Sequence, residues 1–166
     1  MARSRYSGQS MVSVAVVGPP MSGKTTLSCR LADCAMDPYP LFQATCSCSY
    51  LTVCVGDNEW HIWDTPGLET PGAIVDGWAG HACLSEADVV IVCHDGRHAN
   101  PMELVEACGA DRCVIALTKG PGAIFDISYI GSYLTTRTRA GFLVPRAHSK
   151  AGIYTAIKAV LGANCI

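Results

Sequence analysis

An α/β fold built on a mostly parallel sheet is the fold class that this 166-residue sequence predicts. Two observations indicate it: short apolar runs alternate with segments of helical period, and glycine or proline clusters separate them. The apolar runs have the length of strands and fall short of the roughly 20 residues of a membrane span. A hydrophobic content of 49% with 16% charged residues excludes a disordered chain.

The first third of the chain predicts a strand, a helix and a hairpin. Val12–Val17 is a continuous apolar run, which is typical of a strand buried on both faces. Lys24–Ala35 repeats apolar residues at helical spacing, and an Asp-Pro pair followed by a second proline ends it. Tyr50–Val55 and Trp60–Trp63 then flank a Gly-Asp-Asn segment, which is typical of a hairpin turn.

The remaining sequence predicts three more strands and two helices. Ala87–Cys93 and Arg112–Thr118 are apolar runs of strand length, and Gly141–Val144 is a shorter one. Asn100 is a suitable cap for a helix with proline at its first position. Ser149–Gly162 places its apolar residues on one stripe, so we expect a closing amphipathic helix.

Charge and cysteine content narrow the class of protein. The 12 Lys+Arg residues face 14 Asp+Glu residues without a basic run, so we expect no nucleic-acid partner. The 10 cysteines would allow a disulfide framework. Most of them lie in apolar stretches such as Val53–Val55 and Val92–Cys93, which favours reduced core residues in a cytoplasmic protein.

The ends of the chain carry no recognised lipidation signal. Ala2 excludes myristoylation, and Cys165 lies second from the end rather than fourth, so we expect no direct lipid anchor. Residues 1–10 are polar and are expected to be a flexible N-terminus. Residues 11–166 suit a single domain.

The strongest motif is Gly18-Pro-Pro-Met-Ser-Gly23-Lys24-Thr25, which matches the phosphate-binding pattern G-x-x-x-x-G-K-[ST]. Glycine lets the backbone curl around phosphate oxygens, and the lysine adds a positive charge beside them. The threonine hydroxyl is a candidate Mg²⁺ ligand, and the following helix adds the positive end of its dipole. The candidate phosphate-binding residues are Gly18, Ser22, Gly23, Lys24, Thr25 and Thr26.

A second motif, Asp64-Thr65-Pro66-Gly67, ends the apolar strand Trp60–Trp63. After a phosphate-binding loop, an acidic residue at a strand end is well placed to hold Mg²⁺ through a water molecule. The backbone N–H of Gly67 is a candidate sensor of a terminal phosphate. By itself the segment would be an ordinary turn, so the functional interpretation depends on the preceding loop.

With these two motifs, residues 11–163 resemble the Ras-like GTP-binding domain, and the D-T-P-G form resembles its Era and TrmE branches. The resemblance implies a six-stranded sheet with one antiparallel edge and helices on both faces. It also implies GTP or GDP as the ligand and Mg²⁺ as the cofactor.

Thr45 lies 19 residues before Asp64, which is close to the spacing of the second Mg²⁺-binding threonine in these branches. Thr52 is the competing candidate for this role, but it lies inside a predicted strand. The resemblance implies Lys24, Thr45 and Gly67 as catalytic residues and Thr25, Thr45 and Asp64 as metal ligands.

The base-recognition segments depart from the family pattern. Thr118-Lys119-Gly120-Pro121 stands where the family has N-K-x-D or T-K-x-D, and a proline side chain cannot accept hydrogen bonds from guanine. A degenerate form of the S-A-K loop places Ser149 and Lys150 near the base. Thr118, Lys119, Ser149 and Lys150 are therefore candidate nucleotide contacts, while selectivity between guanine and adenine stays open.

Two further departures bear on hydrolysis. Leu68 follows Gly67, where many Ras-like proteins have a glutamine that orients water. Pro20 replaces a small residue of the phosphate-binding loop and crowds an incoming arginine finger. Leu68 predicts slow intrinsic turnover, whereas Pro20 bears on turnover assisted by a partner's arginine.

The resemblance favours a GTP-controlled switch with slow Mg²⁺-dependent hydrolysis. We expect its segments 37–52 and 64–82 to bind protein effectors or regulators. The main alternative is a pseudo-GTPase scaffold that binds nucleotide weakly or without cycling. An ATP-using enzyme with the same loop ranks third.

Overall fold

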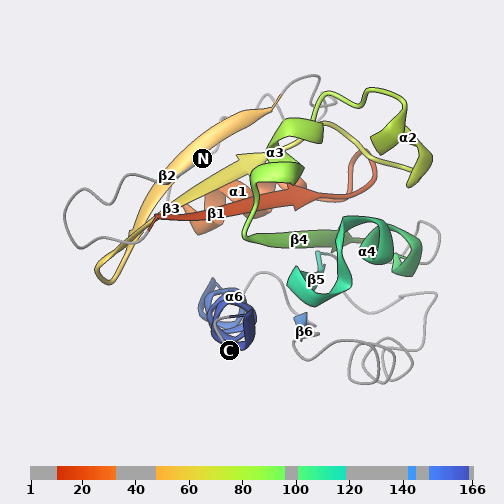
Figure 1. Cartoon of the computed structure of the whole chain (residues 1–166). Coiled ribbons are helices and arrows are strands. Elements are labelled where there is room, and N and C mark those ends of the chain that lie inside the picture. Colours follow the sequence, from red (N-terminus) through yellow and green to blue (C-terminus); the bar gives the residue numbers. More distant parts are fainter. Residues whose placement is uncertain (1–10, 33–47, 96–100, 119–141, 145–149, 165–166) are drawn as a thin grey trace.

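The computed structural model describes residues 11–32, 48–95, 101–118, 142–144 and 150–164. Its strands are β1 (Met11–Val17), β2 (Ser49–Val55), β3 (Asn58–Asp64), β4 (Val89–His94), β5 (Cys113–Leu117) and β6 (Phe142–Val144). They form one six-stranded sheet in the order β2-β3-β1-β4-β5-β6 (Figure 1). β2 and β3 are antiparallel and the other neighbouring pairs are parallel, which confirms the predicted α/β class and its antiparallel edge.

The helices are α1 (Lys24–Leu31), α2 (Gly72–Val75), α3 (His81–Glu86), α4 (Met102–Cys108), the 3₁₀ helix η2 (Ala110–Arg112) and α6 (Lys150–Asn164). The short helices α2 and α3 are absent from the sequence prediction. The predicted N-terminus 1–10 and the predicted cap Asn100 lie outside the described residues. None of the helices within the described ranges is long and apolar enough to cross a membrane.

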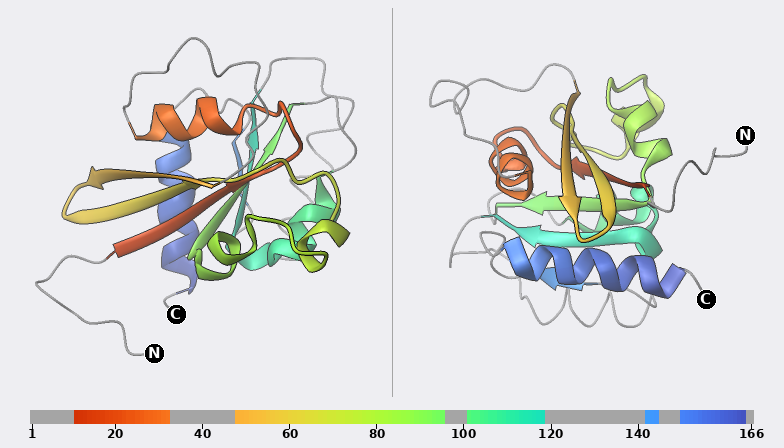
Figure 2. Two further views of the ribbon diagram at one scale, coloured as in Figure 1. Left: turned by 90° about the horizontal axis from the view of Figure 1, so that it is seen from above. Right: turned by 90° about the vertical axis from the view of Figure 1, so that its left-hand side faces the viewer.

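Helices cover both faces of the sheet (Figure 2). The strand β1 contributes side chains to the core on each face. Val14 and Val16 point to the face that α1 and α6 cover, where Leu27 and Ile157 are buried. Ala15 and Val17 alternate to the opposite face, which α3 and α4 cover. The continuous apolar run predicted from the sequence is therefore buried on both sides, as a central parallel strand requires.

The hairpin β2–β3 forms the edge of the sheet, and its turn contains Gly56 at φ 63°. Leu51, Val53 and Val55 pack toward the α1–α6 core. Because side chains alternate along a strand, Cys54 points the other way and is exposed. The prediction that the Val53–Val55 segment buries its cysteine is therefore wrong, since this edge strand is covered on only one side.

The C-terminal helix α6 is tied to the N-terminal half of the domain by an aromatic pair. The rings of Tyr154 and Trp60 meet edge to face, with centroids 5.1 Å apart. The Tyr154 hydroxyl donates a hydrogen bond to the carbonyl of Leu31, the last residue of α1. These contacts close the core under β1 and β3 and hold the C-terminal end of α1 in place.

Ile157 is fully buried at the centre of α6, and Ile157→Ala tests how much this helix contributes. We expect the unfolding free energy to fall by about 2–5 kcal/mol, because truncation removes apolar contacts and leaves a cavity. Urea unfolding followed by circular dichroism measures the change. The neighbouring exposed side chain provides the control, because Lys158→Ala should change stability by less than about 0.5 kcal/mol. Equal effects of the two variants would contradict the packing described for α6.

Candidate nucleotide-binding site

The loop Gly18–Gly23 joins β1 to α1 at the carboxyl end of the sheet. Gly18 has φ 151°, and a Cβ atom there would lie 2.7 Å from the Cys93 carbonyl oxygen and 2.9 Å from Ser22 Oγ. Gly23 has φ 88°, in the left-handed region. Both glycines of the sequence motif are therefore required by backbone conformation, and at Gly18 also by close packing against β4.

Lys24 is the first residue of α1 and is only 5% exposed. Its Nζ donates a 2.8 Å hydrogen bond to the Pro19 carbonyl oxygen, so the ammonium group lies across the loop. Burial lowers the pKa of Lys24, while Cys93 and Asp64 act in the opposite direction. A lysine held in this position presents its charge to whatever the loop encloses.

Thr25 and Asp64 meet where α1 begins and β3 ends. The pairing of Val16 with Asp64 between β1 and β3 brings the carboxylate beside the start of α1. Thr25 Oγ1 donates a 2.6 Å hydrogen bond to Asp64 Oδ2. Asp64 is 2% exposed, and its Oδ1 has no hydrogen-bond partner among the described residues. Burial raises the pKa of Asp64, whereas the Thr25 bond and Lys24 lower it.

A buried carboxylate oxygen without a donor and an adjacent hydroxyl are the ligand types that Mg²⁺ takes. The two residues therefore fit the cofactor that the sequence implies. Elsewhere, the described residues contain no cluster of three or more His, Cys, Asp or Glu side chains that could hold a metal ion.

The turn after β3 is fastened to the phosphate-binding loop. Thr65 Oγ1 donates to the Val16 carbonyl oxygen at 2.7 Å, and the Leu68 N–H donates to the Gly18 carbonyl oxygen at 2.8 Å. A Cβ atom on Gly67 would lie 2.5 Å from Pro20 Cγ, so the two segments are in direct contact. The glycine of this motif is thus needed for close approach to the loop.

Leu68 is fully buried and packs in the core on the α3–α4 side of the sheet. Its side chain fixes the turn after β3 to the apolar core. This position therefore supplies no group that could orient water, in agreement with the sequence argument.

Thr118 contacts the phosphate-binding loop. Its Oγ1 lies 2.5 Å from the Ser22 carbonyl oxygen and 3.2 Å from the His94 carbonyl oxygen. A Cβ atom added at Gly23 would lie 3.2 Å from Thr118 Cβ. Sequence reasoning missed this role, which joins the end of β5 to the loop across 96 positions of sequence.

The structure describes only part of the predicted site. Thr45, Lys119, Ser149 and the base-recognition residue Pro121 lie outside the described residues. Lys150 begins α6, and Thr26 lies in the first turn of α1. The competing threonine, Thr52, lies within β2 opposite His61.

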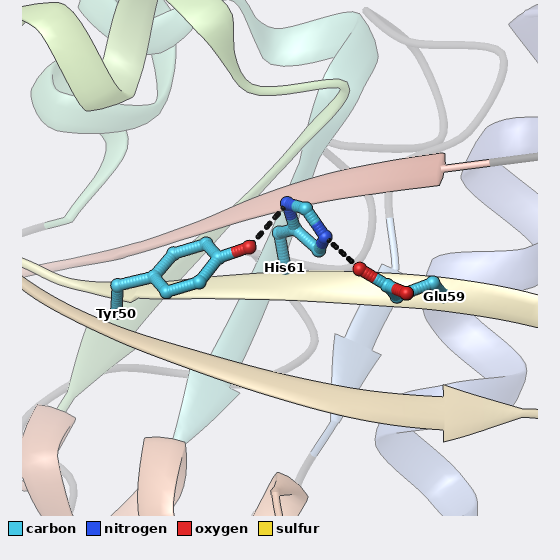
Figure 3. Close-up of polar contacts among 3 residues, drawn as sticks. All are labelled: Tyr50, Glu59 and His61. Atoms are coloured by element: carbon cyan, nitrogen blue, oxygen red, sulfur yellow. Dashed lines mark hydrogen bonds and ion pairs between the residues drawn. The ribbon is translucent and has the colours of Figure 1, made fainter.

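The edge hairpin carries a polar network that sequence reasoning also missed (Figure 3). Tyr50 Oη lies 2.7 Å from His61 Nδ1, and His61 Nε2 lies 2.5 Å from Glu59 Oε1. A neutral histidine can donate from Nε2 to the carboxylate and accept the tyrosine hydroxyl at Nδ1. The Tyr50 ring also packs on Trp63, with centroids 4.7 Å apart, so one member of the network contacts a tryptophan one residue before Asp64.

The site can be compared with known proteins at this point. The model of the 50S ribosome-binding GTPase family matches residues 13–119, which include the phosphate-binding loop and the turn after β3. The chain belongs to this family. It is thus a P-loop GTPase-family domain of the GTP-binding type, as the resemblance implied. No curated protein is similar enough in sequence to count as a match.

Several solved structures share the fold. Era in complex with MgGDPNP and nucleotides 1506–1542 of 16S ribosomal RNA is 18% identical with a TM-score of 0.67, and the match covers 93% of this chain and 57% of that one. The FeoB G domain from Methanococcus jannaschii is 17% identical with a TM-score of 0.66, covering 93% and 99%. SelB from Methanococcus maripaludis, in complex with the GTP analogue GppNHp, is 15% identical with a TM-score of 0.65, covering 96% and 35%. The chain spans only part of Era and SelB and nearly all of the FeoB G domain.

These comparisons overturn one expectation. The balanced charge led us to exclude a nucleic-acid partner, and this exclusion is wrong as a prediction from charge. The family is named for ribosome binding, and the Era structure contains ribosomal RNA. Net charge fails as a criterion because it averages over the domain, whereas contacts to RNA require only a local set of donors.

The burial of Asp64 predicts a pH dependence of stability. Because its pKa lies above the ordinary 3.8, the folded protein keeps this proton to higher pH than the unfolded chain does. The contribution of Asp64 to the unfolding free energy therefore falls as pH rises from about 4 to the raised pKa, by at most about 1.4 kcal/mol per pH unit. The unfolding free energy of the wild type minus that of Asp64→Asn should decrease from pH 4 to pH 7. Urea unfolding without nucleotide or divalent ions measures both values.

The control for this series is Asp57→Asn, which removes one exposed carboxylate of the hairpin turn and so changes the net charge as Asp64→Asn does. A pH-dependent change shared by both variants would reflect net charge rather than the burial of Asp64. If the unfolding free energy of the wild type minus that of Asp64→Asn instead increases with pH, the fold stabilises the charged form of the buried carboxylate.

Proposed function

We propose that the domain binds GTP and GDP with Mg²⁺, hydrolyses GTP slowly, and acts as a nucleotide-controlled switch. One observation carries the proposal: the partner-free Asp64 Oδ1 lies beside the Thr25 hydroxyl at the end of a loop that Lys24 spans. A buried carboxylate, a hydroxyl and an ammonium group around one glycine loop match the charges of a Mg²⁺-bound phosphate chain.

Each residue has a separate role in this proposal. The backbone N–H groups of the loop and Lys24 hold the outer phosphates, and Thr25 and Asp64 hold the metal directly or through water. Thr118 positions the loop through the Ser22 carbonyl. When bound, Mg²⁺ supplies positive charge that offsets the charge of the phosphates. Thr45 is proposed as its second threonine ligand, and the Gly67 N–H as the sensor of the terminal phosphate.

Slow hydrolysis is expected because the side chain that follows Gly67 has no polar group that could orient water. Leu68 is buried in the core, so it cannot orient an attacking water. Pro20 packs on Gly67, and we expect it to crowd an arginine supplied by a partner, which would lower assisted hydrolysis. We expect an intrinsic rate well below about 1 per minute, as for unassisted Ras-type hydrolysis.

The same observations support a second candidate, a pseudo-GTPase scaffold that binds nucleotide without cycling. It would use the same loop but would not respond to the terminal phosphate. The emission experiment below distinguishes the two functions.

Lys24→Ala tests phosphate binding. We expect affinity for a fluorescent GDP analogue to fall about 30- to 1000-fold, the equivalent of 2–4 kcal/mol for a lost charge-assisted contact. Fluorescence titration measures it, with circular dichroism to verify folding. The control Lys158→Ala removes an exposed lysine on α6 and should bind as wild type does. Unchanged affinity in a folded Lys24→Ala protein would refute the proposed site.

Base discrimination is predicted to be weak, because Pro121 stands where the family has an acceptor for guanine. Competition titrations with GDP and ADP measure the ratio of the two affinities. A preference for GDP beyond about 10⁴-fold, or roughly 5.5 kcal/mol, would mean that another group recognises guanine. Asp126→Ala is then the variant to compare with wild type, because Asp126 is the first carboxylate after Pro121 in the sequence.

The switch itself is testable through two tryptophans. Trp63 precedes Asp64, and Trp78 packs between α2 and α3 on the core that holds Leu68. Exchanging GDP for a non-hydrolysable GTP analogue with Mg²⁺ should change tryptophan emission, and Thr45→Ala should reduce the change. Trp63→Phe and Trp78→Phe assign the signal. Identical emission in both nucleotide states would favour the scaffold.

A further inference from the structure

Two cysteines from separate segments lie in contact between the start of β2 and α3. The Cys83 thiol donates to Cys48 Sγ at 3.1 Å, across 35 positions of sequence. The Cys48 thiol in turn points to the Ala79 carbonyl oxygen at 3.7 Å. A disulfide has sulfur atoms about 2.05 Å apart, so the two sulfurs need to approach by only about 1 Å to form a bond.

Access to solvent separates this pair from the core cysteines. Cys93 and Cys113 are fully buried, so small oxidants do not reach them in the folded protein. Cys83 is 9% exposed, while Cys48 is partly exposed and directly precedes the edge strand β2. Cys48 can therefore meet a reagent from solvent, and Cys83 lies behind it.

We propose that Cys48 and Cys83 are a modification site at which a reversible disulfide joins the start of β2 to α3. The co-reactant is a low-molecular-weight disulfide such as oxidised glutathione. The Cys48 thiolate attacks one of its sulfurs, forming a mixed disulfide and releasing one thiol. The Cys83 sulfur then attacks Cys48 Sγ and releases the second thiol. Two protein thiols are oxidised and one small disulfide is reduced to two thiols, so electrons and protons balance.

The resting form of the pair is the dithiol. Burial, the bond from Cys83 and the nearby Asp64 carboxylate raise the pKa of Cys48 to about 12. Because only the thiolate attacks, exchange is slow at neutral pH.

The disulfide would restrain the segments proposed to respond to nucleotide, an inference that rests on the proposed function. Cys48 lies three residues after Thr45, and Cys83 lies just beyond the segment 64–82. A covalent link between β2 and α3 would hold these two segments at one separation in both nucleotide states. We expect oxidation to suppress at least half of the tryptophan emission change that accompanies nucleotide exchange.

The first experiment detects the bond itself and does not depend on nucleotide. The reduced full-length chain is incubated with oxidised glutathione at pH 8.5, digested and analysed by mass spectrometry. We expect a peptide pair linked through Cys48 and Cys83, and a Tm higher by about 5–10 °C that a dithiol reverses. Cys48→Ser or Cys83→Ser should abolish both effects, whereas Cys54→Ser, which alters an exposed cysteine of β2, should keep them. Glutathione adducts on Cys48 without the cross-link would overturn the proposal.

The second experiment measures emission in the reduced and oxidised protein with GDP and with the GTP analogue. A response in the reduced protein that is suppressed after oxidation supports the restraint, and the serine double variant should respond fully in both conditions. An equal response before and after cross-linking would overturn the restraint. Absence of any response in the reduced protein would refute the proposed switch, while the mass and Tm results still decide the disulfide.

Discussion

The close packing of one glycine loop against three strand ends is the constraint on which the rest of the site depends. A Cβ atom on Gly18 would lie 2.7 Å from the Cys93 carbonyl oxygen of β4, and the Gly18 carbonyl accepts the Leu68 N–H after β3. Thr118, at the end of β5, holds the loop from a third side. The protein therefore shapes the loop through its own contacts, which is a form of preorganisation for a phosphate ligand.

Two opposite charges are buried within this framework. Burial lowers the pKa of Lys24 and raises that of Asp64, so the site disfavours the charged form of each. Their mutual attraction offsets only part of this penalty. A ligand that brings a phosphate to the lysine and a cation to the carboxylate would offset more, which links the stability of the domain to its occupancy.

The sequence could predict the parts of the site whose chemistry demands a residue type at a set spacing. The glycines of the loop, Lys24 and the strand-end Asp64 belong to this class, and so do the long buried strands. Contacts between distant segments carry no periodic signal in the sequence. The hydrogen bond from Thr118 to the Ser22 carbonyl and the contact between Cys48 and Cys83 were therefore not predicted. The helices α2 and α3 have four and six residues in a glycine-rich segment, too short for a helical repeat to be recognised.

The burial of Leu68 has a consequence for how the turn after β3 can move. The side chain shares one apolar cluster with Ile74, Trp78 and Leu84, which lie on or beside α2 and α3. Shifting the turn therefore means extracting or repacking a core side chain. Close-packed interiors pass between alternative arrangements in steps, with a barrier of lost contacts between them. A signal that starts at this turn would be all-or-none within each molecule, and only the fraction of molecules in each arrangement would be graded.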